Sequence, residues 1–212
     1  MSIDYWEAEQ EAAYEEFVES LAKELYEEHK EQAIYEFIEE RLQSYYLQNR
    51  DIAMNAIQFV EKSKKIVELE PTTSLLYSSI ATEVILKSVL LKPVVAGLVH
   101  TESLAELVSS ILVRQTGIDR FKELVFKILE SHITFDNGIA NYKREESTDT
   151  LWTERSRIQK VRNKIMHQAD LCCIEDAKLS YSVASTFFDL TKLLVENIGF
   201  RFEANGELVR EK

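Results

Sequence analysis

The sequence of residues 152–170 predicts a helix with an unusual charge. It runs Trp152-Thr-Glu-Arg-Ser-Arg-Ile-Gln-Lys-Val-Arg-Asn-Lys-Ile-Met-His-Gln-Ala-Asp170. Ile158, Val161 and Ile165 follow the three- and four-residue spacing of an amphipathic helix. Apart from the final aspartate, five basic residues stand against a single acidic one, Glu154, in a chain whose net charge is −12. We therefore expect a helix with one apolar strip and a positive surface that can hold a phosphate.

Length and composition place this helix in an all-α protein. The chain has 212 residues and is 45% hydrophobic, which suits one sizeable domain or a domain with an extension. Five glycines and two prolines are few for a β-rich or loop-rich fold. Leu, Glu, Lys and Ala instead recur at helical spacing throughout. The sequence therefore predicts an all-α fold.

Residues 1–50 are expected to form an acidic helical extension. They hold 14 acidic and 4 basic residues, and neither Pro nor Gly occurs before residue 71. Apolar side chains recur at helical spacing, which predicts two amphipathic helices or one long bent helix. The extension either packs against the core or a dimer mate, or lies over the basic segment and competes with RNA. Its periodic apolar residues are Tyr14, Phe17, Val18, Leu21, Leu25, Ile34, Phe37, Ile38 and Leu42.

The rest of the chain divides into a helical bundle, residues 51–198, and a short tail, residues 199–212. Asn205-Gly206 in the tail predicts a small hairpin with a type I′ turn. Pro71, Pro93 and Gly97 are expected to interrupt the helices. In the bundle we expect helices over residues 51–69, 75–91, 103–117, 119–133, 152–170 and 174–198, with an irregular, mobile loop over 135–150.

Cysteine content and hydropathy indicate a cytoplasmic protein. Cys172 and Cys173 are adjacent and are the only cysteines, so one chain cannot build a disulfide framework or a four-cysteine zinc site. We expect them to be core or incidental residues. No apolar stretch is long enough to span a membrane, and the N-terminus is acidic where a secretory signal would be basic. No membrane association, metal or cofactor is expected.

Helical geometry brings chemically useful residues together within the basic segment. Asn163 and His167 lie about 40° apart around a helix, whereas Arg162 lies about 140° from His167. The long arginine side chain can still reach the same phosphate. An Arg and a His at this spacing arise often by chance, so their context has to carry the interpretation.

That context resembles the HEPN domain, an all-helical bundle found in many prokaryotic toxins and defence ribonucleases. Arg162-Asn163-Lys-Ile-Met-His167 matches the family motif R-x4–6-H, including the polar residue after the arginine. The apolar helix Ala81-Thr-Glu83-Val-Ile-Leu-Lys87 and the long helix after His167 also agree. The resemblance implies an up-and-down bundle over residues 51–198 that acts as a homodimeric, metal-independent endoribonuclease of a toxin or phage-defence system, under an antitoxin or other regulatory protein.

The resemblance assigns roles to individual residues. His167 would be the general acid/base, Arg162 would hold the scissile phosphate, and Asn163 would orient the histidine or a phosphate oxygen. The 2′-hydroxyl of the RNA would be the nucleophile, giving 2′,3′-cyclic phosphate and 5′-hydroxyl ends. Glu83 is a possible partner of Arg162 or His167, and alternatively forms a structural ion pair. Four further basic residues would guide the RNA backbone by charge, or simply be solvated or paired with the acidic extension: Arg155, Arg157, Lys160 and Lys164.

One departure from the family pattern concerns regulation. Toxins of this family that are silenced by nucleotide attachment often carry a tyrosine two residues after the histidine, and here that residue is Ala169. We therefore do not expect that form of control. Two other functions stay open, namely a catalytically silent HEPN module that binds a nucleotide or nucleic acid, and a helical scaffold or adaptor that works through its acidic extension.

Overall fold

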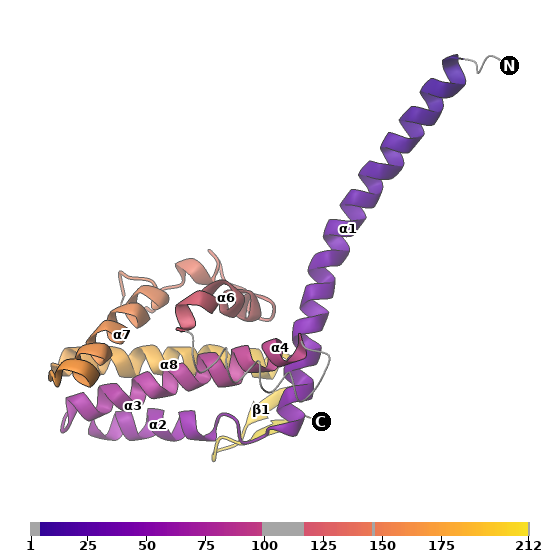
Figure 1. The fold of residues 1–212 in the computed structure, drawn as a ribbon. Helices are drawn as coiled ribbons and strands as arrows, with labels where there is room; N and C mark the ends of the chain where they lie inside the picture. Colours follow the sequence, from indigo (N-terminus) through magenta and orange to yellow (C-terminus); the bar gives the residue numbers. More distant parts are fainter. Residues whose placement is uncertain (1–4, 99–116, 146, 212) are drawn as a thin grey trace. The chain divides into compact units, whose positions relative to one another are not determined.

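The predicted all-α character is confirmed by a computed structural model, which describes residues 5–98, 117–145 and 147–211 (Figure 1). The described part consists of helices and one two-stranded hairpin. The chain forms two compact units, Met1–Glu40 and Arg41–Lys212. The helix expected over residues 103–117 lies outside the described residues. Among the described helices, none combines the length and apolar character needed to cross a membrane.

The first unit consists of helix α1, which continues into the second unit. α1 runs from Tyr5 to Gln48, so the extension is one long helix rather than two. Its last two turns belong to the core of the second unit, where Leu42 and Tyr46 are fully buried. The Tyr46 hydroxyl donates a hydrogen bond to the Val89 carbonyl at 2.9 Å, and burial raises the pKa of this phenol. The helical extension expected over residues 1–50 therefore includes core residues at its end.

Three helices form the centre of the second unit. α2 (Met54–Ile66), α3 (Pro71–Val84) and α8 (Ile174–Asn197) lie side by side (Figure 1). Pro71 occupies the first turn of α3, where its missing N–H removes no helical hydrogen bond. The helix thus begins at this proline and not after it. Small buried serines line the contacts between these helices, and their hydroxyls pair at 2.8 Å (Ser63 with Ser74) and 2.6 Å (Ser78 with Ser180).

The apolar helix was expected to end before Pro93, but it continues through this residue. α3 continues through a π-helical segment, η1 (Ile85–Leu91), into α4 (Lys92–Gly97). Proline lacks the N–H of a regular helix, and a π-helical turn changes the hydrogen-bond pattern just before it. The chain can therefore carry Pro93 within a continuous helix, which ends at Gly97 and not at Leu91 as expected.

A short helix and a structured loop precede the basic helix. The 3-10 turn η2 (Ile118–Phe121) leads into α6 (Lys122–Glu130). The loop after α6 contains a further 3-10 turn, η3 (Ile139–Asn141), and the backbone N–H of Ile139 donates to the Glu130 carboxylate at 2.9 Å. The loop predicted over residues 135–150 thus has hydrogen bonds of its own and one turn of helix.

The basic helix, α7 (Leu151–Gln168), packs against α3 and α8. Trp152 anchors its first turn, because the indole makes edge contacts with Phe126 and Phe187 at centroid distances of 5.3 and 6.4 Å. Trp152 and Tyr46 are therefore packing residues and not platforms for stacked bases.

The C-terminal tail forms the expected hairpin, but its turn differs from the prediction. β1 (Phe200–Phe202) and β2 (Leu208–Arg210) pair antiparallel. A type I′ turn needs positive φ at both central residues, and of Asn205 and Gly206 only the glycine has it, at 87°. The Gly206 N–H instead donates to the Glu203 carbonyl at 2.8 Å. The type I′ prediction was therefore wrong.

Candidate functional site

The predicted site lies on α7, whose two halves have different surroundings. Thr150 caps the helix by accepting a hydrogen bond from the Thr153 N–H at 3.3 Å. The first half is packed into the bundle, whereas most side chains from Asn163 to Gln168 are exposed. Ala169 ends the helix in the left-handed conformation, with φ 55°, which is uncommon for a residue with a Cβ. The helix therefore presents its C-terminal half to solvent.

Arg162 and Asn163 are joined by hydrogen bonds on this exposed half. The Asn163 side-chain oxygen accepts from the Arg162 guanidinium at 3.4 Å and from the Gln159 amide at 3.1 Å. The first bond is long and therefore weak, whereas the second has ordinary length. Asn163 is thus held from both sides and helps to orient the arginine, which is half-buried.

His167 lies one helical turn beyond Asn163 and is exposed. Within the described part of the chain, its imidazole makes no hydrogen bond to Arg162 or Asn163. Both nitrogens are therefore available to solvent and to a bound molecule. The structure thus leaves the histidine and the arginine accessible on the same helix, without direct contact between them.

Two exposed apolar residues lie close to His167 in the sequence. Met166 is 54% exposed and Leu171, just after the helix, is 85% exposed. Leu69, in the turn between α2 and α3, is also exposed. This turn lies at the same end of the bundle as residue 171, because the Cys172 N–H donates to the Thr72 hydroxyl at 3.3 Å. An apolar surface beside a histidine is a suitable place for another protein chain to pack.

Glu83 forms an ion pair with Lys87 and, in the described part of the chain, makes no hydrogen bond to Arg162, Asn163 or His167. Its carboxylate accepts a hydrogen bond from Lys87 at 2.6 Å, and Lys87 is buried. This is the structural ion pair that the sequence left open as an alternative. Glu83 nevertheless lines a small crevice between α3 and α7 together with Gln159.

Arg155 is not placed as expected for a residue that guides RNA. The residue is only 7% exposed, and its guanidinium pairs with Asp119 at 2.6 Å and lies 5.2 Å from the centre of the Trp152 ring. A guanidinium held in this way is not presented to a phosphate at the surface. Helical spacing places Arg155 on the side of α7 opposite Arg157, Lys160 and Lys164. That this side is buried depends on packing against Asp119 and Trp152, which only the tertiary structure shows.

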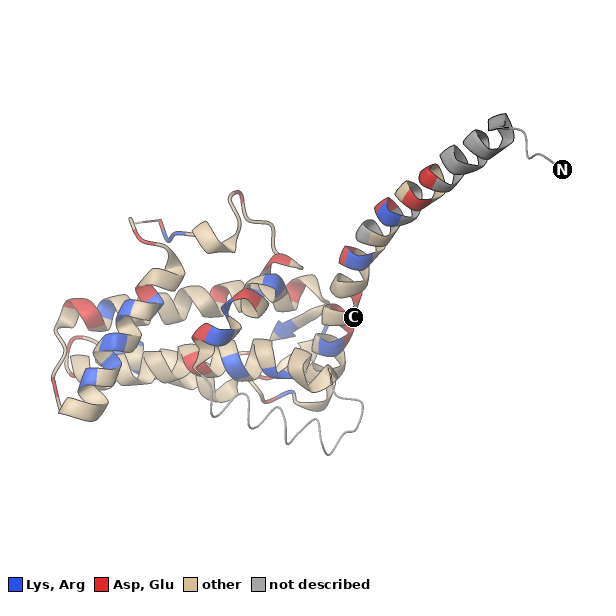
Figure 2. Ribbon diagram, turned by 45° about the horizontal axis from the view of Figure 1, so that its top comes forward, with Lys and Arg blue, Asp and Glu red and all other residues tan. Residues whose placement is uncertain are grey.

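The other three flanking cations remain on the surface. Lys160 and Lys164 are exposed, and Arg157 is exposed while pairing with Asp176 of α8 at 3.0 Å. Figure 2 shows the resulting run of positive charge along α7. The set able to meet an RNA backbone is therefore Arg157, Lys160 and Lys164, with Arg155 left out.

Variants of these cations are expected to separate RNA binding from stability. Changing Lys160 and Lys164 together to Gln removes two exposed charges, so RNA affinity should fall about tenfold and the salt dependence should decrease by about two phosphate contacts. The melting temperature should not change. Arg155→Gln should instead lower the free energy of unfolding by about 2 kcal/mol through lost packing and pairing.

Filter binding at several salt concentrations and thermal melts measure the two effects. The matched control changes Lys64 and Lys65, two exposed lysines of α2, to Gln. Equal loss of RNA binding in this control would contradict a specific role for the α7 lysines.

Gln159 is the functional candidate that the sequence analysis missed. It precedes Asn163 by four residues, a spacing that lets two amides hydrogen-bond along a helix, and this signal was available in the sequence. Cys172 and Cys173 are not functional candidates of this kind. Burial raises the pKa of the Cys172 thiol, which favours the unreactive thiol form.

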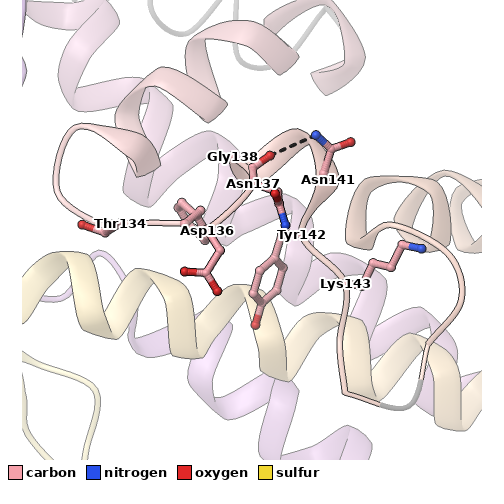
Figure 3. Close-up of a pocket in the computed structure, with 8 residues that line it drawn as sticks. Thr134, Asp136, Asn137, Gly138, Asn141, Tyr142 and Lys143 are labelled. Atoms are coloured by element: carbon pink, nitrogen blue, oxygen red, sulfur yellow. Dashed lines mark hydrogen bonds between the residues drawn. The ribbon is translucent and has the colours of Figure 1, made fainter.

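A separate cavity of about 690 Å³ lies in the loop before α7. Figure 3 shows the Asp136 carboxylate and the Tyr142 hydroxyl pointing in the same direction, with Lys143 directed away from them. Asn141 braces the loop by donating to the Asn137 carbonyl at 2.9 Å. None of the predicted site residues lines this cavity, and its lining residues do not indicate a particular reaction or ligand.

Comparison with models of protein families, with curated proteins and with solved structures finds no match to this chain.

Proposed function

We propose that this protein is a metal-independent endoribonuclease of the HEPN type, serving as a toxin or phage-defence effector. The observation that carries the proposal is the exposed C-terminal half of α7. There a hydrogen-bonded Arg162–Asn163 pair lies one turn from an accessible histidine, His167. The described helices agree with a helical bundle, and the HEPN-like topology is part of the proposal.

The proposed reaction uses the RNA's own nucleophile. The 2′-oxygen forms a bond to phosphorus while the bond from phosphorus to the 5′-oxygen breaks. An imidazole takes the proton of the 2′-hydroxyl, and a second imidazole gives a proton to the departing 5′-oxygen. Arg162 faces the phosphate oxygens, where negative charge grows in the transition state. The products are a 2′,3′-cyclic phosphate and a 5′-hydroxyl.

Two imidazoles imply two chains. Each chain contributes one His167, so the proposed enzyme is a homodimer that pairs two α7 helices around one phosphate. Met166 and Leu171 support this arrangement, because they leave apolar surface uncovered beside the histidine. Arg157, Lys160 and Lys164 would hold the RNA backbone by charge, with little preference for sequence.

Cleavage of labelled RNA in the presence of EDTA tests the proposal. We expect the wild-type protein to cut the RNA and to leave 2′,3′-cyclic phosphate ends, and Arg162→Ala to cut at least about a hundredfold more slowly, because one transition-state contact is lost. Arg201→Ala is the matched control, since Arg201 is an exposed arginine of β1.

Three other results would count against the enzyme. Cleavage that chelation abolishes would mean a metal-dependent reaction. Equal activity of Arg162→Ala and wild type would remove the arginine from the mechanism. Absence of cleavage with retained nucleotide binding would point to a catalytically silent module.

Growth arrest on expression, relieved by Arg162→Ala, would distinguish a toxin from a scaffold.

A further inference from the structure

The first unit carries the net charge of the whole protein. Residues 1–40 include 14 acidic and 2 basic residues, a net charge of −12. The remaining 172 residues hold 23 of each sign. Figure 2 shows acidic residues spread along α1 where the structure describes its side chains. One helix therefore provides a strongly negative surface, whereas the second unit is neutral overall.

This acidic helix also exposes an apolar strip. Phe17 is 61% exposed and Val18 is 44% exposed, and every described side chain from residue 16 to residue 33 is exposed. Tyr14, Leu21 and Leu25 continue the pattern in the sequence. In a helix these five positions fall within about 100° of one another. They define a strip about 18 Å long, given a rise of 1.5 Å per residue.

The helix has little to stabilise it by itself. Long helices in proteins depend mainly on the packing of an apolar face. Acidic residues also recur at four-residue spacing, as in Glu7, Glu11, Glu15 and Glu19, and such like-charge neighbours destabilise a helix. A partner that covered the strip and supplied positive charge would remove both costs.

Charge decides which kind of partner fits. A second copy of this helix would bring another −12 to the same place and would be repelled, and nucleic acid and anionic lipid carry the same sign. A cationic protein surface is attracted. We propose that residues 5–40 form a docking helix for a partner protein that presents a basic amphipathic helix of about three to four turns, matched to the strip.

A synthetic peptide of about 18 residues, with leucines along one face and lysines elsewhere, tests this proposal against the full-length protein. We expect binding by fluorescence anisotropy. Changing Phe17 and Val18 together to Ser should weaken binding at least tenfold. Changing Glu16, Glu19 and Glu24 together to Gln should weaken it and reduce its dependence on salt. The matched charge control changes Glu123, Glu145 and Glu211, three exposed acids of the second unit, to Gln.

Several outcomes would overturn the proposal. Unchanged affinity in the Phe17/Val18 variant would remove the strip from the interface, and equal weakening in the charge control would reduce the effect to net charge. Equal binding of a peptide with glutamates in place of the lysines would exclude a basic partner. Self-association in sedimentation experiments that the Phe17/Val18 variant abolishes would make the occupant a second copy. None of these measurements depends on RNA cleavage.

Discussion

Replacement of His167 by alanine is expected to lower the rate of RNA cleavage by about a thousandfold, because a positioned acid/base group contributes about 10²–10⁴-fold to such reactions. The side chain is exposed and makes no hydrogen bond within the described part of the chain. The free energy of unfolding should therefore stay the same. Single-turnover cleavage of labelled RNA in EDTA measures the rate, and urea unfolding measures the stability.

The control for this experiment is His29→Ala, which removes an exposed imidazole from α1. It should cut RNA at the wild-type rate. Mixing wild type with an excess of His167→Ala gives a sharper test of a shared site, since a mixed dimer retains one imidazole where the mechanism needs two, and activity should fall below the wild-type share. Full activity of His167→Ala would eliminate the proposed mechanism, and a loss of activity that follows unfolding would not support it.

The second large effect is expected at Glu154. This carboxylate is buried in the first turn of α7 and accepts two hydrogen bonds from the Arg144 guanidinium, at 2.7 and 2.8 Å. A third comes from the Ser147 hydroxyl at 2.7 Å. These bonds fasten the loop before α7 to the helix itself. Glu154→Ala should lower the free energy of unfolding by about 3–5 kcal/mol, because it leaves the Arg144 charge partly buried without its carboxylate.

Urea unfolding of the variants measures this interaction. Glu145→Ala is the matched control, because Glu145 is an exposed acid of the same loop and its loss should change stability by less than about 0.5 kcal/mol. The double variant Arg144→Met/Glu154→Met should be more stable than Glu154→Ala, since it removes the guanidinium together with the carboxylate that pairs with it. Additive losses from Arg144→Met and Glu154→Met would contradict a direct interaction.

The same carboxylate predicts a pH dependence. Burial by itself raises the pKa of Glu154, but the hydrogen bonds from Arg144 and Ser147 and the charge of Arg144 outweigh it and hold the pKa below its ordinary value of 4.5. The folded state therefore binds this proton less readily than the unfolded state. The stabilisation is complete above about pH 4.5 and is lost as the pH falls through the folded-state pKa. In Glu154→Gln this part of the acid sensitivity should disappear.

Local sequence signals predicted most of the secondary structure. Apolar periodicity located α1, α2, α7 and α8. The exceptions have physical reasons. Pro93 is carried inside a continuous helix, because a π-helical segment precedes it. The hairpin turn departs from type I′, because Gly206 alone takes positive φ.

The basic residues of α7 show where sequence signals end. Five cations share one helix, and helical spacing puts Arg155 and Arg162 on one side and the other three on the opposite side. Packing decides which side is buried, since Arg155 lies beside Trp152 while Lys160 and Lys164 face solvent. For Glu83 the sequence left two roles open, and the structure shows the ion pair with Lys87, four residues further along the helix.

The sequence by itself determined the helical class, the position of the basic helix and the concentration of negative charge in the first 40 residues, because periodicity and charge are local properties of the chain. Only the tertiary structure decided which side chains reach solvent. Arg155 is enclosed by Asp119 from η2, and Asn163 is held by Gln159 while His167 stays open. Burial depends on which distant segments pack against a residue, and that information is not contained in the spacing of the residue's neighbours.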